Sequence, residues 1–226
     1  HRLITPLFET EALGPVQVKG KAEPVPAYRV LAPRPLVTKP RGIDGLGAPL
    51  VGRQAELNAL KEALVRLQAG QGAVVSIVGE AGIGKSRLVA ELRSSAQGHD
   101  PVHLTWLEGR CLSYGSSLAY LLWLDLLRAL LGVTLDEGPE AVRDLLQGRV
   151  SDLCPGRYDE VYPYLARLMS LSLEVEAEHL MEELAGRELR ARTFHAIETL
   201  LACAARQRPL VVVCEDLHWA DATSLE

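Results

Sequence analysis

SIVGEAGIGKSRLVAEL, the stretch from Ser76 to Leu92, contains the pattern from which the fold can be inferred. An apolar run from Ala73 leads into it, and an amphipathic run ends it. Between the two, Gly79 to Ser86 match the pattern GxxxxGK(S/T). Glycines let the backbone curl so that successive N–H groups point at phosphate oxygens, and the start of a helix adds partial positive charge. The stretch therefore predicts a strand at 73–78, a phosphate-binding loop, and a helix from Lys85.

The polar residues of this loop have separate expected tasks. The Lys85 ammonium should reach the β- and γ-phosphates of a nucleoside triphosphate, and the Ser86 hydroxyl should ligate Mg²⁺. A glycine-rich turn that matches by chance is the alternative, and the apolar run before the loop argues against it. The expected nucleotide-binding residues here are Gly79, Glu80, Ala81, Gly82, Ile83, Gly84, Lys85, Ser86 and Arg87.

A second apolar run, in PLVVVCEDLHWAD, ends in two carboxylates. It predicts a strand at Leu210–Cys214 followed directly by Glu215 and Asp216. Nucleotide hydrolysis needs one group that holds the Mg²⁺ shell and one that polarises the attacking water. Glu215 and Asp216 are therefore the candidate catalytic and metal-binding residues, and the sequence leaves open which acid has which task. Asp221 could cap a following helix or support the acids.

Composition narrows the class of protein. With 48% hydrophobic and 23% charged residues the 226-residue chain is typical of a globular protein. A net charge of -5 without a run of Lys or Arg argues against a nucleic-acid partner. The most apolar long run, 118–133, contains Asp125 and Arg128, so we expect a buried helix and no membrane partner. The four cysteines form no CxxC pair, which favours free thiols and a cytoplasmic protein.

Three segments can be distinguished along the chain. Residues 1–31 alternate apolar and polar positions around a turn, which predicts a small antiparallel β unit. Residues 32–48 are rich in proline and read as a linker. From residue 49 onward, expected strands alternate with helices, which predicts an α/β fold with a parallel sheet. Further expected elements are a helix from Arg53 that ends before Gly70, a strand in VHLTWLEG, a helix at 118–131 between a Ser116 or Ser117 cap and Gly132, and a helix at 188–207.

The motifs of residues 49–226 together carry a family resemblance. LVGRQAELNALKEAL, the loop, and RPLVVVCEDLHWADATS stand in the order found in AAA-type ATPases of the STAND class, which are signal-transduction P-loop NTPases. The resemblance implies ATP and Mg²⁺ as ligands, and it implies that Val51, Gly52 and Arg53 lie against the adenine ring. The family often has two aspartates where this chain has Glu215 and Asp216.

The start of the chain has a resemblance of its own. FETEALGPVQVKGKAEPVPAYRVL, within residues 1–31, is similar to the last strands of class III adenylate/guanylate cyclase domains. The resemblance implies that Lys21 matches a lysine that contacts the cyclase substrate, although a solvated hairpin turn would look the same. The cyclase carboxylates would lie upstream of His1, so we expect no cyclase activity from this chain. The expected partners are an upstream cyclase domain and downstream domains of one longer protein.

These resemblances lead to one expected function and two alternatives. We expect an ATP-binding and slowly hydrolysing regulatory module. A nucleotide-bound scaffold without turnover and a small-molecule P-loop kinase are the alternatives. The implied ASCE-type sheet order is 5-1-4-3-2, and its fourth strand would follow Glu226. The sheet of this chain should therefore be incomplete, with 73–78 and 210–214 both in it but not hydrogen-bonded to each other.

Overall fold

The chain forms two compact units. The computed structural model describes residues 8–17, 24–33, 51–99, 104–112, 119–133, 137–184 and 186–226. The first unit comprises His1–Gly45 with Thr134–Asp136, and the second comprises Leu46–Val133 with Glu137–Glu226.

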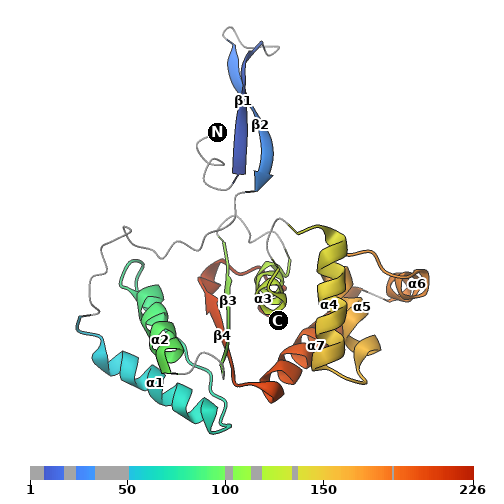
Figure 1. Ribbon diagram of the computed structural model, residues 1–226. Helices are drawn as coiled ribbons and strands as arrows, with labels where there is room; N and C mark the ends of the chain where they lie inside the picture. The colour runs from blue at the N-terminus through green and yellow to red at the C-terminus, as the bar shows by residue number, and fades with distance from the viewer. Residues whose placement is uncertain are drawn as a thin grey trace. The chain divides into compact units, whose positions relative to one another are not determined.

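The described part of the first unit is a β-hairpin (Figure 1). Strand β1 (Phe8–Val16) pairs antiparallel with β2 (Val25–Pro33), as expected for this segment. The pairing is irregular next to Gly14, whose φ of 84° suits glycine. Lys21 lies outside the described residues.

A parallel strand pair forms the sheet of the second unit. Strand β3 (Thr105–Arg110) pairs with β4 (Leu210–Glu215) in register, so that Arg110 lies opposite Glu215. Parallel neighbours need a long crossover connection, and here it contains five helices within the described residues. They are α3 (Leu121–Leu131), α4 (Pro139–Leu153), α5 (Tyr158–Leu168), α6 (Val175–Glu183) and α7 (Gly186–Gln207). Both strands of this sheet were predicted from the sequence.

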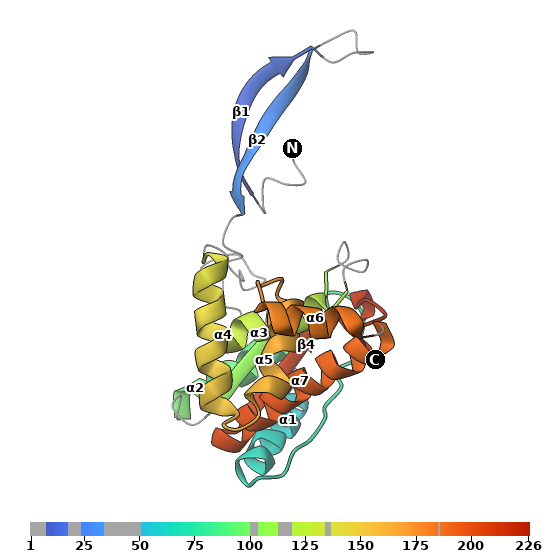
Figure 2. The same cartoon turned by 90° about the vertical axis from the view of Figure 1, so that its right-hand side faces the viewer.

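The larger core covers one face of β3. Leu107 is 2% exposed on this face, and helices α3, α4, α5 and α7 contribute most of the remaining side chains. Figure 2 shows these helices gathered beside the strand pair. Gly109 lets α3 approach closely, because a Cβ there would lie 2.8 Å from Cγ of Leu126. The largest side chains that are fully buried include Leu126, Leu127, Leu146, Leu165, Met181 and Leu200.

Two further helices lie on the other side of β3 (Figure 1). They are α1 (Gln54–Gln68) and α2 (Lys85–His99). Their buried leucines form a second, smaller cluster, against which Ile77 and Trp106 pack. Trp106 and Leu107 are neighbours on β3, so their side chains point to opposite faces. The helix that begins at the loop is therefore seated on the sheet by apolar contacts, as its amphipathic pattern predicts.

The apolar run before the loop is not a strand. Residues 71–80 have no regular secondary structure, so the strand predicted at 73–78 is wrong. Val74 is fully exposed and Val78 is 89% exposed. A strand is held by backbone pairing, and among the described residues β4 pairs with β3 alone. The run is indeed not hydrogen-bonded to 210–214, but its expected place in the sheet is not observed.

Other expectations concern helix ends, cysteines and membrane spans. Helix α3 begins at Leu121 after Tyr120, which has a φ of 64° and acts as the N-cap, whereas Ser116 and Ser117 lie outside the described residues. Gly132 and Gly70 end their helices with φ values of 69° and 80°, as predicted. All four cysteines are free thiols, as expected. In the described ranges no helix has the length and apolarity to cross a membrane.

Candidate nucleotide-binding site

Each glycine of the loop occupies a position where a side chain would be unfavourable. Gly82 and Gly84 have φ values of 80° and 99°, a region that side chains with a Cβ rarely adopt. At Gly79 a Cβ would lie 3.1 Å from Cγ2 of Ile83, so a larger residue would press on the loop. The N–H of Leu88 donates to the Gly84 carbonyl at 3.0 Å, which starts the helix immediately after the last glycine. The loop thus turns at its glycines and leads directly into α2, as the phosphate-binding pattern predicts.

The Lys85 side chain folds back over this curl. Its Nζ donates to the carbonyl oxygens of Gly79 at 2.8 Å and of Glu80 at 2.9 Å. The ammonium therefore sits over the loop, where the positive end of α2 also lies. Lys85 and Ser86 are half-buried, whereas residues 79–84 are exposed. This arrangement presents two hydrogen-bond donors of the kind that phosphates bind, one from the lysine and one from the serine.

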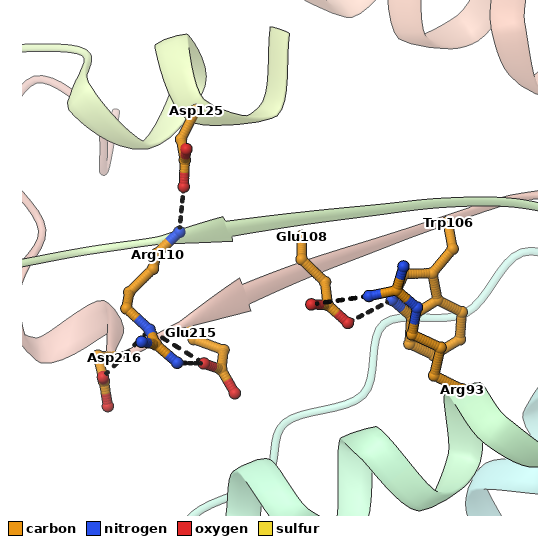
Figure 3. A network of polar contacts seen from close by, with 7 residues as sticks. All are labelled: Arg93, Trp106, Glu108, Arg110, Asp125, Glu215 and Asp216. Atoms are coloured by element: carbon orange, nitrogen blue, oxygen red, sulfur yellow. Dashed lines mark hydrogen bonds and ion pairs between the residues drawn. The ribbon is translucent and has the colours of Figure 1, made fainter. Parts of the chain in front are cut away.

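The two predicted acids lie together at the carboxyl end of β4. Glu215 is its last residue, and Asp216 follows with a φ of 57° and caps the short helix η1 (Leu217–Trp219). Their side chains are 17% and 22% exposed. The structure thus brings the predicted acids into one half-buried pair beside the end of β3 (Figure 3).

Arg110 contacts both acids and was not predicted as a site residue. Its Nε donates to Oε2 of Glu215 at 3.1 Å, its Nη2 donates to the same oxygen, and Nε lies 4.0 Å from Oδ2 of Asp216. The hydrogen bond that Arg110 donates to Glu215 raises the pKa of Arg110 against the opposing effect of burial. A sequence signal existed, because Arg110 follows the strand motif VHLTWLEG and the ends of parallel strands meet at one edge.

Two aspartates, Asp125 on α3 and Asp221 after the acids, make further hydrogen bonds near the carboxyl ends of β3 and β4. Oδ2 of Asp125 accepts the backbone N–H of Arg110 at 3.0 Å, which ties the end of β3 to α3. The buried Asp221 carboxylate accepts the N–H and the hydroxyl of Ser224 at 2.9 and 2.6 Å and the N–H of Tyr120 at 3.4 Å. Burial would raise the pKa of Asp221, but these hydrogen bonds lower it overall. Asp221 therefore caps the turn at 222–225, whereas the helix expected to follow it is not observed in these residues.

The residues expected near the adenine ring lie at the start of α1. Val51 is 80% exposed, Gly52 has a φ of 72°, and Arg53 is the N-cap residue of the helix. The Arg53 guanidinium binds Glu56 at 2.9 Å, and on α2 Arg87 binds Glu91 at 3.3 Å. Leu57 of α1 and Leu88 of α2 belong to the same apolar cluster. This cluster links the start of α1 with the loop helix.

The residues present fit ATP and Mg²⁺. Mg²⁺ is usually held by one or two carboxylates together with substrate phosphates rather than by a cage of protein ligands. Ser86, Glu215 and Asp216 supply ligand types of this kind. In the part of the chain that is described, no three His, Cys, Asp or Glu residues group as a metal site.

Comparisons with known proteins agree with this geometry. Residues 49–226 match a family model described as an AAA ATPase domain. An uncharacterized protein of Rhizobium meliloti (strain 1021) is 30% identical over 212 residues, which cover 93% of this chain. The same match covers 20% of that relative, so the chain spans about a fifth of its length. No solved structure matches.

Proposed function

Because the chain belongs to the AAA ATPase domain family over residues 49–226, we propose that it binds ATP and hydrolyses it slowly to reset a regulatory switch. The family has the α/β fold of P-loop NTPases. The observation that carries the proposal is the curled loop with the Lys85 ammonium held over it by two carbonyl oxygens. The positive φ values of Gly82 and Gly84 and the helix that starts directly after them support a loop whose backbone can cradle an anion.

The residues of the site would act as follows. Lys85 would exchange its carbonyl partners for β- and γ-phosphate oxygens, while the backbone N–H groups of 79–86 bind the same phosphates. A bound Mg²⁺ supplies charge neutralisation at these phosphates, and Ser86 with the acid pair would hold it. Glu215 and Asp216 would divide metal ligation and the orientation of water between them. Arg110 holds the Glu215 carboxylate by a hydrogen bond from Nε, which would keep this acid oriented for its task.

The motifs support a finer placement of the domain. Within the family we assign residues 49–226 to the STAND class, on the basis of Val51-Gly52-Arg53 and of LHWAD after the acids. We propose that residues 1–31 are the end of a class III cyclase domain and that 32–48 link the two. The antiparallel pairing of β1 and β2 is compatible with this origin. The partners would then be ATP or ADP and other domains of the same protein.

Phosphate release by the intact protein tests the proposal. With ATP and Mg²⁺ we expect slow formation of ADP and inorganic phosphate, and we expect chelation of the metal to stop it. Binding of ATP without any turnover would favour the nucleotide-bound scaffold. Transfer of the γ-phosphate to a small molecule instead of water would favour the kinase. Absence of nucleotide binding would contradict the proposal in every form.

A further inference from the structure

A row of three polar side chains follows one face of β3. Side chains alternate along a strand, so Trp106, Glu108 and Arg110 point away from the face that Leu107 and Gly109 bury against α3. Figure 3 shows this row between helix α2 and the acids at the end of β4. The strand thus contacts both halves of the candidate site with one face.

Glu108 is the member of the row that binds the loop helix. Its Oε2 lies 3.2 Å from Nη1 of Arg93 on α2, and its Oε1 accepts the indole N–H of Trp106 at 2.6 Å. Each carboxylate oxygen therefore has its own partner. The Trp106 ring also packs against the cluster that contains Leu88 and Leu92 of α2. The indole thus orients the carboxylate and supports the helix that the carboxylate binds.

The strength of this ion pair suits a positioning role better than a stabilising one. The side chains of Arg93 and Glu108 are 43% and 35% exposed. Ion pairs at such exposure contribute little to stability, so the apolar cluster holds α2 in place. Apolar contacts are non-directional, however, and they leave rotation and sliding of a helix weakly specified. A charged hydrogen bond to one fixed carboxylate specifies both.

The position of the pair connects it to the chemistry. Arg93 follows Lys85 by eight residues, which is about 12 Å along a helix. Glu108 precedes Arg110 by two residues, and Arg110 holds Glu215. In the described structure residues 71–80 are not paired with the sheet, so the loop is seated by the apolar contacts of α2 together with the packing of Ile77 against the same cluster. A shift of α2 on β3 would therefore move the loop relative to the acids.

We propose that Arg93, Glu108 and Trp106 are positioning residues of the ATPase site, which fix the loop helix on the strand that also holds Glu215. The proposal rests on the proposed function of the loop and acids. These residues would align the bound nucleotide with the acids, whereas the affinity for nucleotide would come from the loop.

The test compares turnover with affinity in the intact protein. Arg93→Met, Glu108→Gln and the double variant are assayed for the Kd of ATP and for kcat. Loss of an ion pair at this exposure lowers the population of the aligned state by no more than about fivefold, so we expect kcat to fall by about twofold to fivefold in Arg93→Met with the Kd for ATP nearly unchanged. The double variant should lose no more than the worse single variant, since both changes break one contact. Arg93→Lys, which keeps a charged donor, should recover most of the turnover.

Controls separate this claim from the proposed function. Arg192→Met breaks an ion pair with Glu188 of the same 3.2 Å length on α7, and it should leave kcat unchanged. Hydrogen exchange of residues 85–99 without nucleotide should be faster in Arg93→Met and close to normal in Arg93→Lys. If the wild-type protein does not bind ATP, the proposed function fails. The exchange measurement needs no nucleotide, so it still tests whether Arg93 fixes α2 on β3. The inference would be overturned if Arg93→Met had the same turnover and hydrogen exchange as Arg192→Met. It would also be overturned if the losses of kcat in the two single variants added fully in the double variant.

Discussion

Arg110 and Glu215 lie directly opposite each other at the ends of β3 and β4, and their side chains are joined by hydrogen bonds from Nε and Nη2 to one carboxylate oxygen. The Glu215 side chain is 17% exposed, so its charge is largely removed from water. The hydrogen bond raises the pKa of Arg110, which keeps the guanidinium charged. The two strands are thus locked at the edge where the predicted acids lie.

Arg110→Met should destabilise the protein. The change leaves the half-buried Glu215 charge without this donor, and loss of a charge-assisted hydrogen bond costs about 1–3 kcal/mol. Urea unfolding measures the difference in the free energy of unfolding. Arg66→Met, at an exposed position of α1, is the control and should change it by less than about 0.5 kcal/mol. Equal stability of the two variants would mean that the ion pair does not hold the edge.

Gly109→Ala should destabilise the core between β3 and α3. The new Cβ would lie 2.8 Å from Cγ of Leu126 and 2.9 Å from Cδ1 of Leu122, and both leucines are buried. Such overpacking costs about 1–3 kcal/mol. Gly148→Ala in α4 meets nothing within 4 Å and should instead stabilise the protein by about 0.4–1 kcal/mol. The two melting temperatures should therefore move in opposite directions, and a shift in the same direction would contradict the close approach of α3.

Asp221→Asn should reveal a pH-dependent contribution to stability. The pKa of Asp221 is lowered in the folded protein below its ordinary value of 3.8. Its contribution is therefore present above that value and is lost as the pH falls through the lower folded pKa. At pH 7 the free energy of unfolding of the wild type should exceed that of the variant by about 0.5–2 kcal/mol, which is the usual contribution of a capping residue. The difference between the two urea midpoints should shrink as the pH falls from 3.8 through the lower folded pKa, and a constant difference would exclude this role of the carboxylate.

Amide variants of the acids should separate binding from turnover. Glu215→Gln and Asp216→Asn keep the shape of each side chain but remove its charge and basicity. ATP should still bind through the loop, while hydrolysis should fall by about a hundredfold or more. Glu62→Gln, on the exposed surface of α1, is the matched control. If hydrolysis is insensitive to both changes at the acids, β4 does not carry the metal-binding residues.

The sequence predicted those parts of the site whose conformation depends on neighbouring residues in the chain. The curl of the loop follows from its glycines, and α2 follows from its apolar spacing, so both could be inferred from 79–92. The state of 73–78 could not, because a strand exists only where a neighbour pairs with it. Arg110 was missed for a related reason, since its partner Glu215 is 105 positions away. Helix boundaries within 138–186 were also unpredictable, because the apolar period is weak there and α5 contains Pro163.

Titration of the intact protein with labelled ATP, alongside Lys85→Ala, tests whether the loop binds a nucleoside triphosphate. Loss of one charge-assisted contact weakens binding by about 1.5–3 kcal/mol, and Lys85 is expected to contact more than one phosphate. We therefore predict that wild type binds ATP, that Lys85→Ala loses most of this affinity, and that Lys61→Ala on α1 binds like wild type. Unchanged affinity in Lys85→Ala would contradict the assignment of the loop as the nucleotide-binding site.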